Sequence, residues 1–166
     1  MLSDTLQNAL NKQIAEEAYA SDYYLSMASW CEVKGLPGTA SFLYDHALKE
    51  REHMMKLFRY VNAAGGHALL QKGEQAPDKF KSLLNVLELV LEHEISVTAC
   101  INKLVDVCLK EKDYSTFNFL QWYVAEQHED ERLLKSLLDL IKMAGTEGRG
   151  LFLVDHEIGK LTNKRA

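Results

Sequence analysis

Residues 65–78 read GGHALLQKGEQAPD, and this stretch decides how the rest of the chain is arranged. It separates two long segments whose apolar residues recur at helical spacing. A helix of about 26 residues is about 39 Å long, whereas about fourteen extended residues reach about 46–50 Å. The connection can therefore run the full length of such a helix, which allows the helices on either side to lie parallel. A wandering surface loop is the alternative, although loops of this length in compact domains usually have a reason.

Helical spacing extends from this connection in both directions and predicts four long helices. Ser3 or Asp4 offers an N-cap to the first helix. Gly65 and Gly66 end the second, and Gly145 closes the fourth. A short apolar segment after Gly145 predicts a small fifth helix. We expect helices at about residues 5–33, 39–64, 79–110, 115–144 and 150–161.

The other two connections within the bundle are only about four residues long, and each forces its two helices into an antiparallel pair. Two such hairpins joined by one long crossover form the ferritin-like arrangement. We therefore predict an all-α, ferritin-like four-helix bundle with one long crossover and a short fifth C-terminal helix. Residues 1–166 are expected to form a single domain, with the bundle at about 5–144.

The composition suits a globular domain and argues against a nucleic-acid partner. The 166 residues are 47% apolar and include only two prolines, so a sizeable core and nearly unbroken helices are expected. Acidic residues outnumber basic ones by 24 to 19, and the only basic cluster is Lys164 with Arg165. A nucleic-acid binder needs a clustered basic surface. The net charge of −5 leaves the attraction of cations open.

The cysteines and the first residues predict a cytoplasmic protein. Cys31, Cys100 and Cys108 form no Cys-x-x-Cys pattern and are odd in number, which favours reduced thiols. Residues 1–8 lack the basic and apolar regions of a secretory signal. No uncharged apolar run approaches the roughly 20 residues of a membrane span, so no membrane association is expected.

Acidic side chains interrupt the apolar faces of the predicted helices. Glu94 is the clearest case, because the positions three, four and seven residues away lie on its face of the helix. Those positions hold Leu87, Val90, Leu91, Val97, Thr98 and Ile101. A carboxylate on such a face needs a compensating partner. The same test selects Glu17 on the first helix, Glu50 with His53 on the second, and Gln127 with Asp130 on the fourth.

These inward polar groups, one or two from each helix, predict a buried cation site. Several carboxylates and one imidazole would repel each other in a dry bundle unless cations neutralised them. Oxygen donors with one nitrogen suit iron or manganese, and two metals bridged by shared carboxylates would use the ligands best. Two simpler interpretations remain: Glu17 could pair with a lysine or arginine, and His53 could be an ordinary, partly buried histidine. A helical adaptor with salt-bridged acids would then result.

Several stretches of the chain resemble the bacterial non-heme ferritin family. They are EAY at residues 17–19, EREH at residues 50–53, HE at residues 93–94 and TFNFLQWYVAEQHE at residues 116–129. The resemblance covers essentially the whole chain. It implies a first iron held by Glu17, Glu50 and His53, and a second held by Glu50, Glu94 and Asp130, with Glu50 as the bridge.

Three further residues acquire roles from the same resemblance. Gln127 resembles the amide beside the iron pair, and Tyr24 resembles the site tyrosine within reach of Glu94. Trp122 resembles a nearby aromatic residue that could supply or quench an electron. For Tyr24 and Trp122, plain core packing is the alternative interpretation.

The chain departs from the family pattern at two positions. Asp130 stands where glutamate is usual, so the second iron would be held more weakly or indirectly. Lys49 stands where many members have a glutamate that forms a third iron site with the residues matching Glu126 and Glu129. A protonated lysine cannot be a ligand. Our hypothesis is that Lys49 pairs with Glu126 or Glu129 and weakens or removes the third site.

The resemblance implies an iron-storage ferritin with ferroxidase activity. Two Fe(II) per subunit would be oxidised by dioxygen or hydrogen peroxide, and a ferric oxyhydroxide mineral would form inside a shell of 24 copies, with the fifth helix near the fourfold axes. No haem is expected, because Arg51 follows Glu50 where haem-binding relatives have methionine. The alternative is a ferritin-like di-iron oxidase or peroxide-detoxifying protein that stores no bulk mineral.

Overall fold

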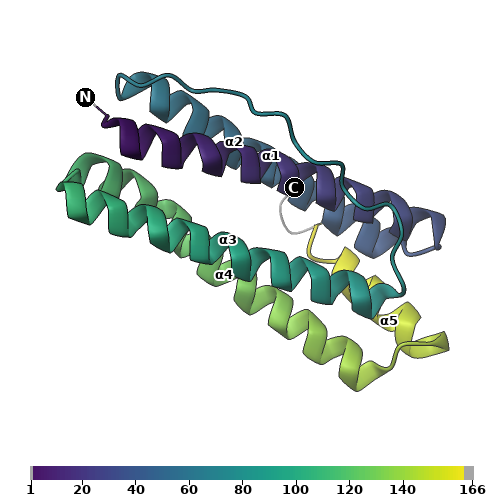
Figure 1. Cartoon of the computed structure of the whole chain (residues 1–166). Helices are drawn as coiled ribbons and strands as arrows, with labels where there is room; N and C mark the ends of the chain where they lie inside the picture. Colours follow the sequence, from purple (N-terminus) through teal and green to yellow (C-terminus); the bar gives the residue numbers. More distant parts are fainter. Residues whose placement is uncertain (1, 163–166) are drawn as a thin grey trace.

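The computed structural model describes residues 2–162, which form five α-helices and no strand. They are α1 (Asp4–Val33), α2 (Pro37–Ala63), α3 (Leu83–Glu111), α4 (Tyr114–Ala144) and α5 (Gly148–Gly159), as Figure 1 shows. The predicted all-α bundle with a short fifth helix is confirmed. Within the described residues, no helix combines the length and the apolar character needed to cross a bilayer. The basic pair Lys164 and Arg165 lies outside the described residues.

The crossover between α2 and α3 runs the length of the bundle, as the sequence predicted (Figure 1). Helices α2 and α3 are consequently parallel, while α1 with α2 and α3 with α4 form antiparallel hairpins. The crossover is tied down by the buried side chain of Asn11 on α1. Its amide nitrogen donates to the His67 carbonyl at 3.0 Å, and its oxygen accepts from the Leu69 amide at 2.9 Å. Asn11 thus satisfies backbone groups of an extended segment that forms no helix or sheet hydrogen bonds of its own.

Helix α3 begins later than predicted, at Leu83 rather than at residue 79. The Ser82 hydroxyl accepts from the backbone N–H of Asn85 at 3.1 Å, and the Asn85 side chain accepts from the N–H of Lys81 at 3.2 Å. This reciprocal cap ends the extended crossover and starts the helix. Apolar spacing does not reveal a start position that depends on a cap.

Helix α2 begins earlier than predicted, at Pro37 rather than at residue 39, because α5 caps it. The Asp155 carboxylate accepts from the N–H of Gly38 at 3.0 Å, and from the N–H and hydroxyl of Thr39 at 2.7 and 2.8 Å. Proline at the first helical position has no N–H to satisfy. A Cβ on Gly38 would lie 2.0 Å from the Asp155 carbonyl oxygen, so this close approach of α2 and α5 requires glycine.

The apolar core has two parts with a polar layer between them. One part includes Ala20 on α1, Ala47 on α2 and Val90 on α3, and the other includes Ile14, Met54 and Val97 on the same helices. Each of the four long helices passes from one part to the other through the polar positions that the sequence singled out. The fold therefore brings those positions to one level near the middle of the bundle.

We predict that Asp155→Ala lowers the free energy of unfolding by about 2 kcal/mol, because three hydrogen bonds at the start of α2 are lost. Chemical denaturation followed by circular dichroism would measure this. Glu157→Ala on the same helix is the matched control, since its contact with Lys160 is on the exposed surface and should contribute far less than the cap. Equal stabilities of the two variants would contradict the cap.

Candidate metal centre

The polar layer consists of side chains from all four long helices, each at most 3% exposed. Its members are Glu17, Glu50, His53, Glu94, Gln127 and Asp130. All six positions predicted from sequence are therefore buried in the fold. Their interactions divide them into a group around His53, a group around Glu94 and an ion pair at Asp130.

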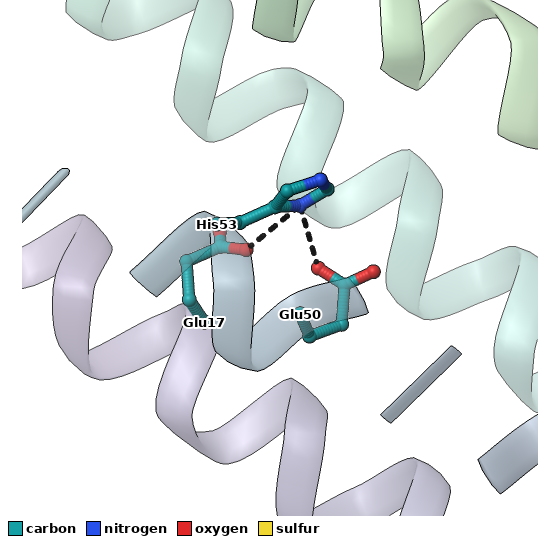
Figure 2. A group of neighbouring side chains, drawn as sticks. All are labelled: Glu17, Glu50 and His53. Atoms are coloured by element: carbon teal, nitrogen blue, oxygen red, sulfur yellow. Dashed lines mark hydrogen bonds and ion pairs between the residues drawn. The ribbon is translucent and has the colours of Figure 1, made fainter. Parts of the chain in front are cut away.

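Figure 2 shows the first group, in which two carboxylates approach one imidazole nitrogen. His53 Nδ1 lies 3.1 Å from Glu50 Oε2 and 3.6 Å from Glu17 Oε2. One ligand atom from each of the three residues lies within 4.8 Å of the others. The pair Glu50 and His53 belongs to one turn of α2, and Glu17 comes from the antiparallel α1. These residues are the predicted ligands of the first iron.

The second group holds Glu94 in place with two donors. The Tyr24 hydroxyl donates to Glu94 Oε1 at 2.5 Å, and the Gln127 amide donates to Glu94 Oε2 at 2.9 Å. Tyr24 is fully buried on α1 and reaches across to α3. Tyr24 is thus within reach of Glu94, as the resemblance implied, and Gln127 lies beside the same carboxylate. Among residues 2–162 the Gln127 side-chain oxygen has no hydrogen-bond partner.

Asp130 forms an ion pair that sequence analysis did not predict. The Lys49 ammonium lies 2.6 and 2.9 Å from its two oxygens and 3.6 Å from Glu126. The predicted pairing of Lys49 with Glu126 or Glu129 is present at Glu126, but the short contacts are to Asp130. Which carboxylate the Lys49 ammonium contacts most closely depends on how far this long side chain reaches from α2 toward α4. The spacing of residues in the sequence does not encode that distance.

Glu126 and Gln13 support the first group, and sequence analysis assigned neither of them to it. Glu126 Oε2 lies 2.6 Å from His53 Nε2, so it orients the imidazole from the far side. The Gln13 amide donates to Glu17 Oε1 at 2.5 Å. Gln13 was detectable, since it lies four residues before Glu17 on one helix face. The link between Glu126 and His53 crosses between helices and leaves no such signal.

Burial raises the pKa of the two central carboxyl groups. For Glu94 desolvation outweighs the hydrogen bonds from Tyr24 and Gln127, and its pKa rises to about 7. Desolvation also raises the pKa of Glu50, and the neighbouring carboxylates Glu94 and Glu17 add to the effect. For His53 burial favours the neutral ring, but hydrogen bonds and charges of Glu17 and Glu50 prevail and raise its pKa to about 10.

Trp122 packs beside the first group in an aromatic stack. Its ring lies 4.6 Å from that of Tyr123 and 5.2 Å from that of His53, centroid to centroid. The Lys56 ammonium lies 4.1 Å above the Trp122 ring. A positive charge over the indole makes the loss of an electron less favourable, so these contacts favour the packing interpretation of Trp122.

The donor set fits a divalent cation. Glu17 Oε2 and Glu50 Oε1 are buried without hydrogen-bond partners, and such atoms need an explanation. Within residues 2–162, no lysine or arginine forms an ion pair with Glu17, Glu50 or Glu94. Carboxylate oxygens with one imidazole nitrogen are the ligands of iron or manganese. A cation bound here would also meet an imidazole already oriented by a third carboxylate, Glu126.

Known proteins match the chain over nearly its whole length. Residues 7–144 match the Ferritin family, described as a ferritin-like domain. The chain is 48% identical over 164 residues to a probable bacterial non-heme ferritin-like protein of Haemophilus influenzae. It is also 48% identical over 165 residues to the bacterial non-heme ferritin of Campylobacter jejuni. Each alignment covers 99% of both chains. A novel open pore ferritin from Archaeoglobus fulgidus matches with a TM-score of 0.93 at 38% identity, covering 96% of this chain and 98% of that one.

We predict that the metal-free protein becomes less stable as pH rises from 5.5 to 8.5. Folding raises the pKa of Glu94 from 4.5 to about 7 and that of His53 from 6.5 to about 10. Groups with raised pKa stabilise the fold below their unfolded pKa, and this contribution is lost as pH rises toward the folded value. Thermal unfolding of chelator-treated protein should show a fall in Tm of about 5 °C or more.

Two comparisons test whether this pH dependence of stability comes from the metal centre. Glu94→Gln should flatten the slope between pH 5.5 and 7, whereas Glu88→Gln, at an exposed position on the same helix, should leave it unchanged. Co(II) added at pH 8 should raise Tm, because a ligand that binds only the folded state stabilises it. A Tm of the metal-free wild type that stays constant or rises over this range would contradict the electrostatics described here.

Proposed function

The chain belongs to the ferritin family, and this membership supports a role in iron storage. We propose that the protein oxidises Fe(II) at a two-iron centre within each subunit and stores the product as a ferric mineral. The observation that carries the proposal is the buried set of carboxylates Glu17, Glu50 and Glu94, with which no lysine or arginine among residues 2–162 forms an ion pair. Iron is here the substrate and the stored cargo. No haem has a role in the proposal.

The first Fe(II) would bind to Glu17, Glu50 and His53. Binding at Nδ1 of His53 requires loss of a proton, because the imidazole is a ligand only when that nitrogen is unprotonated. Glu126 stays on Nε2 and keeps the ring in place. Glu17 Oε2, 3.6 Å from this nitrogen, and Glu50 Oε1 have no hydrogen-bond partner within residues 2–162. These two carboxylates supply negative charge, which stabilises Fe(III) more than Fe(II) and so favours oxidation.

The second Fe(II) would bind to Glu50, Glu94 and Asp130, with Glu50 shared between the two ions. Two Fe(II) give up two electrons, and dioxygen takes them with two protons to form hydrogen peroxide. Hydrogen peroxide as oxidant takes two electrons and two protons to form two water molecules. Tyr24 holds Glu94 by donating its hydroxyl proton in a hydrogen bond, and Gln127 holds the other oxygen.

Storage requires a container, and we propose a hollow shell of 24 copies in the cytoplasm. Helix α5 exposes Phe152 and Leu153, at 74% and 49%, and these side chains suit contacts between copies. The cysteines Cys31, Cys100 and Cys108 are free thiols, in keeping with a reducing compartment. Lys49, paired with Glu126 at 3.6 Å, would weaken a third iron site at Glu126 and Glu129.

We predict that Glu50→Ala slows aerobic oxidation of Fe(II) at least about tenfold, because both irons lose a shared ligand. The rate is measured by ultraviolet absorbance of the ferric product after addition of two Fe(II) per subunit. Glu88→Ala is the control, since it removes an exposed carboxylate of α3 and should leave the rate unchanged. Equal rates for wild type and Glu50→Ala would remove Glu50 from the mechanism.

Sedimentation velocity should give a particle of about 450 kDa for 24 copies of the 18.9 kDa chain. After repeated loading with Fe(II) and dioxygen, the particle should become denser and retain many more than two irons per subunit. A monomer or dimer would exclude storage. A particle that consumes peroxide but retains no mineral would favour the peroxide-detoxifying alternative.

A further inference from the structure

The contact between Lys49 and Asp130 is the feature of the metal centre that the proposed function does not explain. Lys49 points from α2 toward α4, and its ammonium contacts both oxygens of Asp130 at 2.6 and 2.9 Å. The Lys49 side chain is 16% exposed and that of Asp130 is 4% exposed, so the pair is largely removed from water. Both oxygens that a second metal would use on Asp130 are therefore already neutralised by a cation of the protein.

The same ammonium is linked to the first metal position through one intermediate side chain. Lys49 lies 3.6 Å from Glu126, whose Oε2 lies 2.6 Å from His53 Nε2. His53 Nδ1 in turn faces Glu50 at 3.1 Å and Glu17 at 3.6 Å. Positive and negative groups thus alternate from Asp130 to Glu50. The two ends differ within residues 2–162. At the His53 end, Glu17 Oε2 and Glu50 Oε1 have no hydrogen-bond partner, whereas both Asp130 oxygens accept from the Lys49 ammonium.

We propose that Lys49 is a tethered cation that competes with the second metal ion for Asp130. A metal at the Glu17, Glu50 and His53 end displaces only a proton, whereas a metal at Asp130 must displace an ammonium held by two short contacts. Breaking a buried ion pair costs free energy unless the incoming charge replaces the outgoing one. Metals therefore bind in a fixed order, with the second site weakened by the competition.

The structure provides a place for the displaced ammonium. Lys49 lies in the lining of a surface groove that also contains five carboxylates and one other cation, Arg132. The carboxylates are Asp45, Glu52, Glu126, Glu129 and Asp130. Lysine has a flexible four-carbon side chain with a compact charge, so the ammonium can move outward and find other carboxylates. The competition is thus reversible, and the second site is weakened without being abolished.

The test is anaerobic titration with Co(II), followed by calorimetry and by the visible spectrum of the bound metal. This proposal rests on the proposed function only for the identity of the physiological metal. Co(II) binding is measured directly, so the result does not depend on iron oxidation. In the wild type we expect one tight site and a second at least about tenfold weaker. Lys49→Gln should tighten the second site by about tenfold or more and change the first by less. Lys49→Met, which removes the same charge with another shape, should do the same.

Two further variants separate this competition from a general effect of charge. Arg51→Gln also removes one positive charge from α2, but Arg51 is exposed and pairs with Asp22 at 3.2 Å, so both Co(II) affinities should stay as in the wild type. Asp130→Asn combined with Lys49→Gln should lose most of the gain, because the freed ligand is no longer present.

The proposal is overturned if both Lys49 variants fold, as judged by circular dichroism and an intact tight site, and yet bind the second Co(II) no more tightly than wild type. It is also overturned if Arg51→Gln produces the same gain as Lys49→Gln. If Co(II) binding behaves as expected but no variant oxidises Fe(II), the proposed function fails while the competition at Asp130 stands.

Discussion

The desolvation of several carboxylates at one level of a helical bundle is the constraint on which the rest of this structure depends. Glu17, Glu50 and Glu94 are each at most 2% exposed, and burial alone disfavours their charged forms. They divide the apolar core into two parts, so each long helix must extend on both sides of the polar layer to bury enough apolar surface. Helices of 27 to 31 residues meet that requirement.

The protein compensates these carboxylates in three different ways. Glu94 receives hydrogen bonds from the neutral donors Tyr24 and Gln127. Glu17 and Glu50 share one imidazole, and one oxygen of each has no hydrogen-bond partner within residues 2–162. Asp130 has a cation of the protein, Lys49, as its partner. This graded compensation matters for function, since a site with free oxygens attracts a metal and a site already neutralised must exchange one cation for another.

The connections keep the helices in register around the polar layer. The crossover brings α3 alongside the first hairpin, and Asn11 holds it at two backbone groups. Helix α5 returns from α4 to cap α2 through Asp155, which links the two hairpins at one end of the bundle. Glu50 and His53 on α2 are thereby held at the level of Glu94 on α3. The accuracy of the metal centre therefore rests partly on contacts far from it.

The sequence by itself determined the helices, their order, the parallel course across the crossover and the inward position of Glu17, Glu50, His53, Glu94, Gln127 and Asp130. These properties follow from apolar spacing and connection length, which are local or nearly so. The start of α3 at Leu83 and of α2 at Pro37 depended on caps, one of them from a helix more than a hundred residues away. Only the tertiary structure decided that Lys49 meets Asp130 and that Glu126 meets His53. Such pairings depend on the distance between helices and the reach of individual side chains, and no periodic pattern in the chain carries that information.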